Sequence, residues 1–228
     1  MMVMVATKQD IEREAQRLEG KGLALAGYTE EILLRLAQKT WRINRLKEEK
    51  NAVIPAHVYQ RAEIIHGIAD FTGDSYRLSK LCAEAKAGTI VFCGVRFMAE
   101  TAKILSPDKA VILPALEAGC SLAESITGED ARRLRSKYPG LPAICYINTT
   151  ADVKAECDVV VTSANARKIL ERLYEKHPRL IFLPDELMGL NLARDLGKRV
   201  GEEMIIWKGK CVVHEDFETS WVERYRKE

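Results

Sequence analysis

The chain has 228 residues, of which 47% are hydrophobic and 30% are charged. This composition is typical of a globular protein and excludes a disordered chain and a coiled coil. The 35 basic and 33 acidic residues leave a formal net charge of only +2, so we expect neither nonspecific nucleic-acid binding nor membrane binding. The longest uncharged stretch, residues 138–151, contains two prolines and is too short to cross a bilayer.

The N-terminal sequence MMVMVATKQDIERE has no basic segment before its apolar residues and becomes polar from Lys8 onward. It therefore does not resemble a secretory signal, and we expect a reducing, cytoplasmic location. In such a compartment the six cysteines are expected to be buried thiols or metal ligands rather than disulfides.

Two helices are predicted before residue 52, each opened by a threonine that can cap it. Thr7 is followed by Asp10 at capping-box spacing, and Gly20 ends the first helix. Thr29 opens the second helix, whose apolar positions 32, 36, 43 and 46 recur at helical spacing. This segment is interpreted as an amphipathic lead-in.

From residue 52 onward, short apolar runs alternate with helical segments. The predicted strands are residues 52–54, 89–93, 110–113, 143–147, 159–161, 180–183 and 204–207. The predicted helices are residues 76–86, 97–105, 121–136, 164–176 and 187–199. This alternation predicts an α/β fold of parallel sheets with helices on both faces.

The second half of the chain repeats the first. FTGDSYRLSKL matches VVTSANARKIL, IVFCGVRFMAETAKIL matches IFLPDELMGLNLARDL, and AVILPALEAGC matches MIIWKGKC, all in the same order. The expected organisation is a helical lead-in (1–51), two αβα repeats (52–122 and 123–211) and the start of a third repeat (212–228).

Several polar residues recur at matching strand ends, where open α/β sheets bind ligands. Ser75 and Ser163 stand at strand-to-helix junctions, where each is predicted to cap its helix and to bind an anion; a capping role without a ligand is the alternative. His57 and Tyr59 follow the first strand of one repeat, and Tyr146 and Asn148 occupy the corresponding strand of the other. These four side chains are candidates to orient a substrate or move protons, against the alternative of structural packing.

Cys120 and Cys211 end their repeats at matching places, each beside a glycine or one residue from it. Cysteines far apart in sequence, one per repeat, suit a metal cluster better than a zinc ribbon, which needs paired cysteines. Core thiols are the interpretation for the other four cysteines, Cys82, Cys93, Cys145 and Cys157. His214 lies near enough to Cys211 in sequence to be a weaker candidate around the metal site.

Long segments of the chain resemble the quinolinate synthase family, the iron–sulfur transferases of NAD biosynthesis. The segments are LKEEKNAVIPAHVYQ, IADFTGDSYRLS, FCGVRFMAETAKIL, LEAGCSLAES, YINTTADVKAECDVVVTSANA and GKCVVHEDF. The resemblance implies tandem Rossmann-like three-layer αβα repeats, two of the three pseudo-threefold domains of that fold. It also implies that iminoaspartate and dihydroxyacetone phosphate are condensed to quinolinate.

The same resemblance implies roles for individual residues. Cys120 and Cys211 would be two of three cysteine ligands of a [4Fe-4S] cluster, and the third ligand is missing from this chain. Tyr59 and Tyr146 would act in catalysis. The substrate-binding residues would be His57, Ser75, Tyr146, Asn148 and Ser163. The enzyme that oxidises L-aspartate is a candidate partner because it supplies iminoaspartate.

The family has a third domain with a His-Pro-Glu-Cys segment, which is not found in these 228 residues. The expectation is therefore a C-terminally truncated quinolinate synthase that is inactive by itself. One alternative is a non-catalytic two-domain module that binds small anions or serves assembly. The other is a different three-lobed iron–sulfur enzyme.

Overall fold

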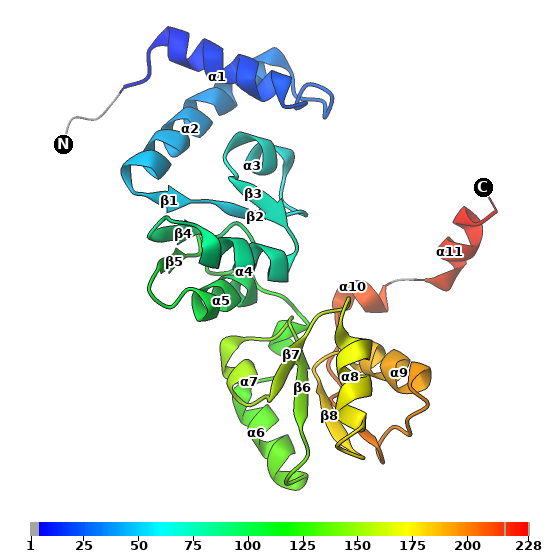
Figure 1. Ribbon diagram of the computed structural model, residues 1–228. Helices are drawn as coiled ribbons and strands as arrows, with labels where there is room; N and C mark the ends of the chain where they lie inside the picture. The colour runs from blue at the N-terminus through cyan, green and yellow to red at the C-terminus, as the bar shows by residue number, and fades with distance from the viewer. Residues whose placement is uncertain (1–4, 217, 228) are drawn as a thin grey trace. The chain divides into compact units, whose positions relative to one another are not determined.

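The computed structural model describes residues 5–216 and 218–227 (Figure 1). The chain divides into two compact units; the first ends at Ala118 and the second begins at Gly119. None of the helices in the described residues is long and apolar enough to span a membrane. The boundary lies shortly before residue 122, where the first repeat was expected to end, so Cys120 packs with the second unit.

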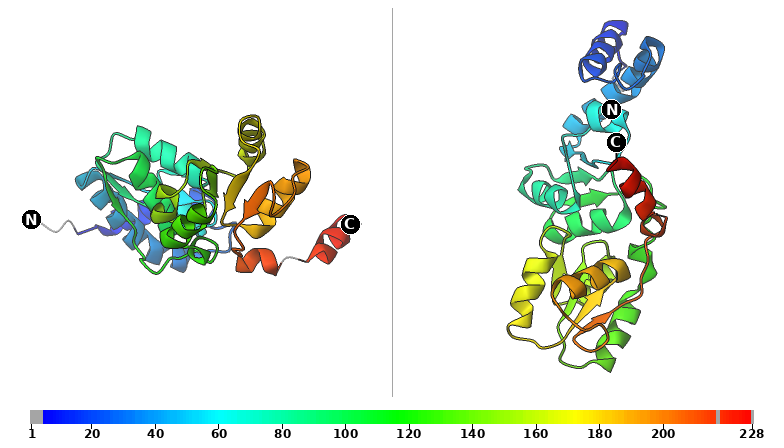
Figure 2. Two further views of the ribbon diagram at one scale, coloured as in Figure 1. Left: turned by 90° about the horizontal axis from the view of Figure 1, so that it is seen from below. Right: turned by 90° about the vertical axis from the view of Figure 1, so that its right-hand side faces the viewer.

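The first unit begins with a helical hairpin of α1 (Lys8–Gly20) and α2 (Glu30–Glu49), which lie side by side in Figures 1 and 2. Thr7 and Asp10 form the predicted capping box, and the Thr29 side chain accepts a hydrogen bond from the backbone of Ile32. Both predicted helix starts are therefore confirmed. The buried stripe of α2 is Leu33, Ala37 and Thr40 rather than the predicted positions 32, 36, 43 and 46.

The rest of the first unit alternates strands and helices. Its elements are β1 (Ala52–Val53), β2 (Pro55–His57), α3 (Ala62–Gly67), β3 (Phe71–Gly73), α4 (Ser75–Glu84), β4 (Thr89–Val91), α5 (Arg96–Leu105) and β5 (Ala110–Ile112). β1 pairs with β4, which pairs with β5, and β2 pairs with β3, all in parallel. Because β1 and β2 follow each other along one path and Ala56 also bridges to Cys93, the spatial order is β3, β1/β2, β4, β5.

The second unit has the same strand order. Its elements are the 3-10 turn η1 (Ala123–Ser125), α6 (Gly128–Lys137), β6 (Ala143–Tyr146), α7 (Ala151–Ala155), β7 (Val159–Val161), α8 (Ala166–Tyr174), β8 (Leu180–Leu183), α9 (Glu186–Asp195), β9 (Met204–Ile206), α10 (Val212–Glu215) and α11 (Thr219–Tyr225). The parallel sheet runs β7-β6-β8-β9. If the strands of each unit are counted along the chain, their spatial order is second, first, third, fourth in both units. This confirms the predicted α/β class with parallel sheets.

The sheet of the second unit is buried on both faces. Successive residues of a strand point to opposite faces, and in β8 Leu180 and Phe182 join one apolar cluster with α8 and α9 while Ile181 and Leu183 join another with α6 and α7. Figure 1 shows α6 and α7 on one side of this sheet and α8 and α9 on the other. This is the expected three-layer αβα arrangement.

The sheet of the first unit is less completely covered. Ile90 of β4 is fully buried, whereas its neighbours Thr89 and Val91, on the opposite face, are only partly buried. Ile112 of β5, which pairs with Val91, is 49% exposed. One face of this sheet is therefore open to solvent at its β5 edge.

Several short elements were missed or misjudged in the sequence analysis. β3, α3 and α7 were not predicted, and the helix expected at 121–136 is divided into η1 and α6 at Ile126 and Thr127. Thr127 caps α6 by a capping box with Asp130. Three to six residues are too few for hydrophobic periodicity to appear, which explains the missed elements.

Residues 212–228 were expected to start a third repeat, and the spacing of Phe217, Trp221 and Tyr225 by four residues predicts an apolar helix face there. Phe217 lies outside the described residues. α10 and α11 bury no residue, and Trp221 and Tyr225 are exposed.

Candidate functional site

The carboxyl ends of the second unit's parallel strands bring polar side chains to one edge of the sheet. Tyr146 is the last residue of β6, Ser163 follows β7, Asp185 follows β8 and Cys211 follows β9. Parallel strands present their carboxyl ends at the same edge, which is where open α/β sheets bind ligands. The candidate site is built at this edge.

Tyr146 is the central phenol of this edge. Burial raises its pKa, and the negative charge of Asp185 raises it further, while a hydrogen bond with the Ser163 side chain opposes the rise. Cys120 and Cys211 are also near enough that a thiolate at either position would raise the pKa of Tyr146. The phenol is therefore held in its protonated form, as a hydrogen-bond donor, between a serine, a carboxylate and two cysteines.

Asp185 is a buried acid at the N-terminus of α9. It is 3% exposed, and its Oδ1 accepts a hydrogen bond of 2.9 Å from the backbone N–H of Met188. Its Oδ2 lies 3.4 Å from Nδ1 of His214 on α10. A hollow of about 540 Å³ adjoins these groups, and its lining includes Tyr146, Ser163, Asp185, Met188 and His214.

The segments that carry the two candidate cysteine ligands lie side by side. Next to Cys211, the backbone N–H of Val212 donates to the hydroxyl of Ser121, which follows Cys120, at 3.3 Å. A few residues along, Trp207 Nε1 donates to the carbonyl of Ser125 at 3.1 Å. Both thiols are partly buried and free. The structure thus brings together the two segments that carry these cysteines.

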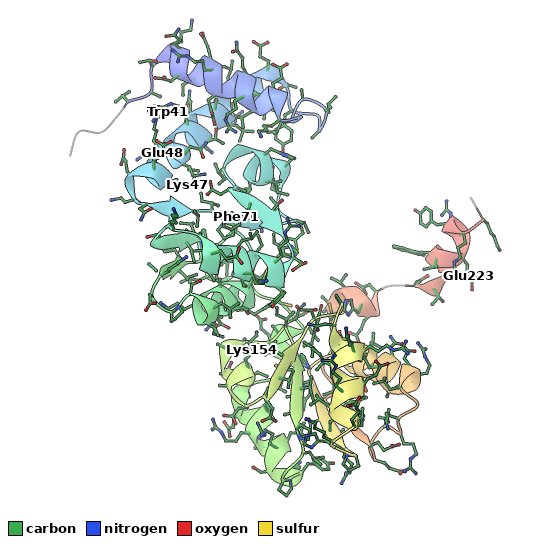
Figure 3. The ribbon with its side chains drawn as sticks, viewed as in Figure 1. Trp41, Lys47, Glu48, Phe71, Lys154 and Glu223 are labelled. Atoms are coloured by element: carbon green, nitrogen blue, oxygen red, sulfur yellow. The ribbon has the colours of Figure 1, made fainter. Side chains whose placement is uncertain are left out.

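Asn148 lies in the turn that follows β6 and does not line the hollow beside Tyr146. The ammonium of Lys154 holds this turn in place: it donates to the carbonyl of Ile147 at 2.9 Å and to that of Thr149. Lys154, labelled in Figure 3, comes from α7 and is almost entirely buried. A buried lysine with these two acceptors fixes the backbone on both sides of Asn148.

The first unit places its three candidate residues at the ends of β2 and β3. The rings of His57 and Tyr59 contact each other with centroids 4.0 Å apart, and the Tyr59 hydroxyl reaches the sulfur of Met98 at 3.7 Å. Burial lowers the pKa of His57, against the opposing charge of Asp74. Ser75 is buried in the first turn of α4.

The predicted capping roles of Ser75 and Ser163 are wrong. The cap of α4 is Asp74, whose Oδ1 accepts a hydrogen bond from the backbone N–H of Arg77 at 2.9 Å. The residue at the N-cap position of α8 is Asn165, whose side chain makes no capping hydrogen bond. Asn165 Oδ1 instead accepts from the backbone of Thr162, which closes the turn holding Ser163. The two serines are thus free of the capping function.

Two of the four remaining cysteines contact each other. Cys145 of β6 is fully buried, and its hydrogen bond with Cys157 lowers the pKa of Cys145 and raises that of Cys157. Cys82 is fully buried in α4. Across residues 5–216 and 218–227, no group of three or more His, Cys, Asp or Glu residues is arranged to hold a metal ion.

Asp185 and Met188 were not singled out from the sequence. The available signal was an acid two residues before the helix predicted at 187–199, which can cap the backbone N–H of the residue three positions later. The role of Asp185 depends on its burial against the segment from β9 to α10, which the local sequence does not reveal.

A Rossmann-like parallel sheet with a phenol, a buried carboxylate and two free thiols near its carboxyl edge defines an α/β protein whose polar groups gather where such sheets bind ligands. The family described as "NadA: Quinolinate synthetase A protein" matches residues 41–228. The chain belongs to this quinolinate synthase family.

Three relatives illustrate the match, each called quinolinate synthase. The protein of Sinorhizobium medicae is 46% identical over 185 residues, which cover 81% of this chain and 50% of the relative. That of Caulobacter vibrioides is 50% identical over 177 residues, 77% of this chain and 47% of the relative. That of Aquifex aeolicus is 49% identical over 185 residues, 81% of this chain and 56% of the relative. The chain spans about half the length of these relatives.

Proposed function

We propose that this chain supplies part of a quinolinate synthase, which condenses iminoaspartate with dihydroxyacetone phosphate, releasing two waters and phosphate, in NAD biosynthesis. The observation that carries the proposal is the approach of the Cys120 and Cys211 segments beside Tyr146, where Val212 donates to Ser121. In a family member, two thiols and a protonated phenol at one sheet edge are suited to polarising and protonating a small oxygenated substrate.

The two thiols fit as ligands of a [4Fe-4S] cluster, since cysteine thiolates are the ordinary ligands of such clusters. Both are free and partly buried, and their segments are held together by the Val212–Ser121 hydrogen bond. A cluster bound there would supply a Lewis acid to polarise a substrate oxygen. Two thiolates are fewer than a cluster requires, so we propose that this chain by itself holds iron weakly and makes no quinolinate.

The chain's own side chains have separate tasks in this proposal. Tyr146 remains protonated near neutral pH and donates a hydrogen bond or a proton from its hydroxyl. The exposed Ser163 hydroxyl and the Asn148 amide bind polar groups of the substrate, and Lys154 keeps the Asn148 turn in place. In the first unit, Tyr59, neutral His57 and Ser75 are proposed to contact substrate.

The proposal includes a reducing, cytoplasmic setting, in which cysteines ordinarily remain free thiols. It also includes transfer of iminoaspartate from the enzyme that oxidises L-aspartate. Iminoaspartate hydrolyses readily, and this favours a nearby source. Comparing quinolinate yield with that enzyme present and with pre-formed iminoaspartate tests this partner.

The ligand assignment is tested by anaerobic reconstitution of the 228-residue chain with iron and sulfide. We expect substoichiometric iron with broad visible absorbance, which Cys120→Ala and Cys211→Ala abolish and Cys93→Ala preserves. Iron content unchanged in Cys120→Ala would contradict the assignment. Binding of dihydroxyacetone phosphate without any iron would instead favour a small-anion binding module.

The enzymatic activity is tested in a chimera in which residues 41–228 replace the matching segment of the Aquifex aeolicus relative. We expect quinolinate formation, lost on Cys120→Ala and reduced about 10²- to 10⁴-fold by Tyr146→Phe, the range of general acid–base contributions. Ser163→Ala is expected to weaken substrate binding by about 1.5–3 kcal/mol, as for a hydrogen bond to a charged group. A folded, iron-loaded chimera that makes no quinolinate would refute the proposed function.

A further inference from the structure

Asp185 is fixed more firmly than a helix cap needs to be. Its Oδ1 accepts the Met188 amide, and the backbone around it pairs with the segment after β9, since Glu186 N–H donates to the Gly209 carbonyl and Gly209 N–H donates to that of Pro184, both at 3.0 Å. A Cβ on Gly209 would collide with the Pro184 carbonyl oxygen, so this approach requires glycine. The contact that positions the carboxylate also positions the chain leading into α10.

The second carboxylate oxygen of Asp185 faces His214 of α10. Nδ1 of His214 lies 3.4 Å from Asp185 Oδ2, and the imidazole is 49% exposed along the hollow that Tyr146 also lines. Catalytic hydrogen bonds are often long before ligand binds. The geometry therefore places a buried carboxylate beside Nδ1 of an imidazole that lines the hollow.

Capping alone does not explain a buried charge at this place. The other aspartate N-cap, Asp74 at α4, is exposed, and α1, α2 and α6 are capped by neutral threonines. Burying a carboxylate is costly unless it has partners. With Oδ1 occupied by the Met188 amide, His214 is the partner for Oδ2, and the Tyr146 phenol lies within range of the same charge.

We propose that Asp185 is a positioning residue of the second unit's site, which accepts the Nδ1–H of His214 so that Nε2 is the basic nitrogen presented to substrate. The catalytic use of that nitrogen rests on the function proposed above, whereas the tautomer itself does not. Carboxylates hold histidines in this manner in hydrolase triads and around metal ligands. His214 Nε2 then serves as a proton acceptor opposite the protonated Tyr146.

The tautomer is measured by nitrogen-15 NMR of the metal-free chain labelled at histidine, at about pH 8.5, roughly two units above an ordinary imidazole pKa. His214→Gln identifies the signals among the four histidines. We expect the Nδ1–H form, opposite to the Nε2–H form that free histidine prefers. A native chain in which His214 shows the Nε2–H form would overturn the proposal, whatever the variants do.

Asp185→Asn sharpens the test because its amide oxygen still caps the Met188 N–H, so its NH₂ must face His214. An NH₂ donor requires an unprotonated Nδ1, so His214 should change to the Nε2–H form while the other histidine signals stay in place. Asp74→Asn, which keeps the matching cap on α4, is the control and should leave His214 unchanged. An Asp185→Asn variant that retains the Nδ1–H form would also refute the proposal.

In the active chimera, Asp185→Asn should lower kcat about 10²-fold or more with little change in KM, as expected for loss of a correctly oriented proton acceptor. Equal activity of this variant, alongside the expected tautomer change, would refute only the catalytic use of His214. A chimera inactive even without substitutions would refute the proposed function and leave the tautomer result standing.

Discussion

The two units share one strand order but bury their sheets differently. Ile205 of β9 is 6% exposed, whereas Ile112 of β5, on the fourth strand of the other unit, is 49% exposed. In the second unit α6 and α7 complete a second apolar cluster, and in the first unit the segment before the first strand, α2, packs instead into a hairpin with α1. Strand order is therefore a property of the repeat, while coverage depends on how the preceding helix is used.

The units also differ in the connection after their last strand. After β9 the chain turns back at Gly209 against Pro184 and Ser125, and this brings Cys211 to the segment of Cys120. Both candidate cysteines consequently belong to the second unit. The repeated topology supplies matching strand ends, and the tight connection at Gly209 places the segment of Cys211 against that of Cys120.

The largest expected effect concerns sheet coverage. Ile205→Ala should destabilise the second unit by about 2–5 kcal/mol, because it leaves a cavity in a packed core. The matched change Ile112→Ala in the first unit should cost less than about 1 kcal/mol, since that side chain is half exposed. Urea unfolding followed by Trp207 fluorescence for the second unit and Trp41 fluorescence for the first measures both. Equal losses would mean that the open face of the first unit is covered in solution.

Gly209→Ala should cost about 1–3 kcal/mol, the usual effect of overpacking. Its Cβ would meet the carbonyl oxygen of Pro184, which cannot move away as a flexible side chain would. Gly88→Ala in the first unit is the control, because nothing lies closer than 3.9 Å to its Cβ. Thermal unfolding gives the stability, and thiol labelling of Cys211 should become faster in the Gly209 variant alone.

Asp74→Ala should weaken the first unit by about 1 kcal/mol through loss of the α4 cap. Ser163→Ala, at the matching junction of the second unit, should change stability by no more than about 0.5 kcal/mol, since α8 has no side-chain cap. Chemical denaturation of both variants measures the difference. A loss of about 1 kcal/mol in Ser163→Ala would show that Ser163 caps α8 after all.

The smallest effect is the pH dependence from His57. Its pKa is lower in the folded chain than the ordinary 6.5, because burial disfavours the charged form. Between these two values the unfolded chain binds a proton that the folded chain does not, so stability is complete above about pH 6.5 and falls as pH drops through the lower folded value. His57→Gln should remove this part of the slope in denaturation curves measured across that range. An unchanged slope would show that His57 titrates normally.

Local signals predicted the elements that they control. The threonine caps at Thr7 and Thr29 predicted α1 and α2, and apolar runs predicted β6 to β9 within one or two residues. β3 was missed because Phe71-Thr72-Gly73 is too short and ends in glycine. The Ser75 cap was misassigned because Asp74 competes for the same amide and an aspartate caps at least as well as a serine.

The candidate site was only partly accessible to sequence reasoning. The repeat singled out Tyr146, Ser163, Cys120 and Cys211, and the structure groups these four within one unit. Asn148 was placed with Tyr146 on the strand of the second repeat, but β6 ends at Tyr146 and Asn148 lies in the turn that follows. Asp185 escaped notice because its matching position in the other repeat is Val95, which carries no charge.

The sequence by itself determined the class of fold, the repeat and most helix starts, because capping and apolar alternation act between residues three or four positions apart or on successive strand positions. Only the tertiary structure decided which sheet face is covered, that Asp185 is buried, and that Ser121 lies against Val212. These features depend on how distant segments close on one another. Contacts between residues 91 positions apart leave no periodic trace in the sequence.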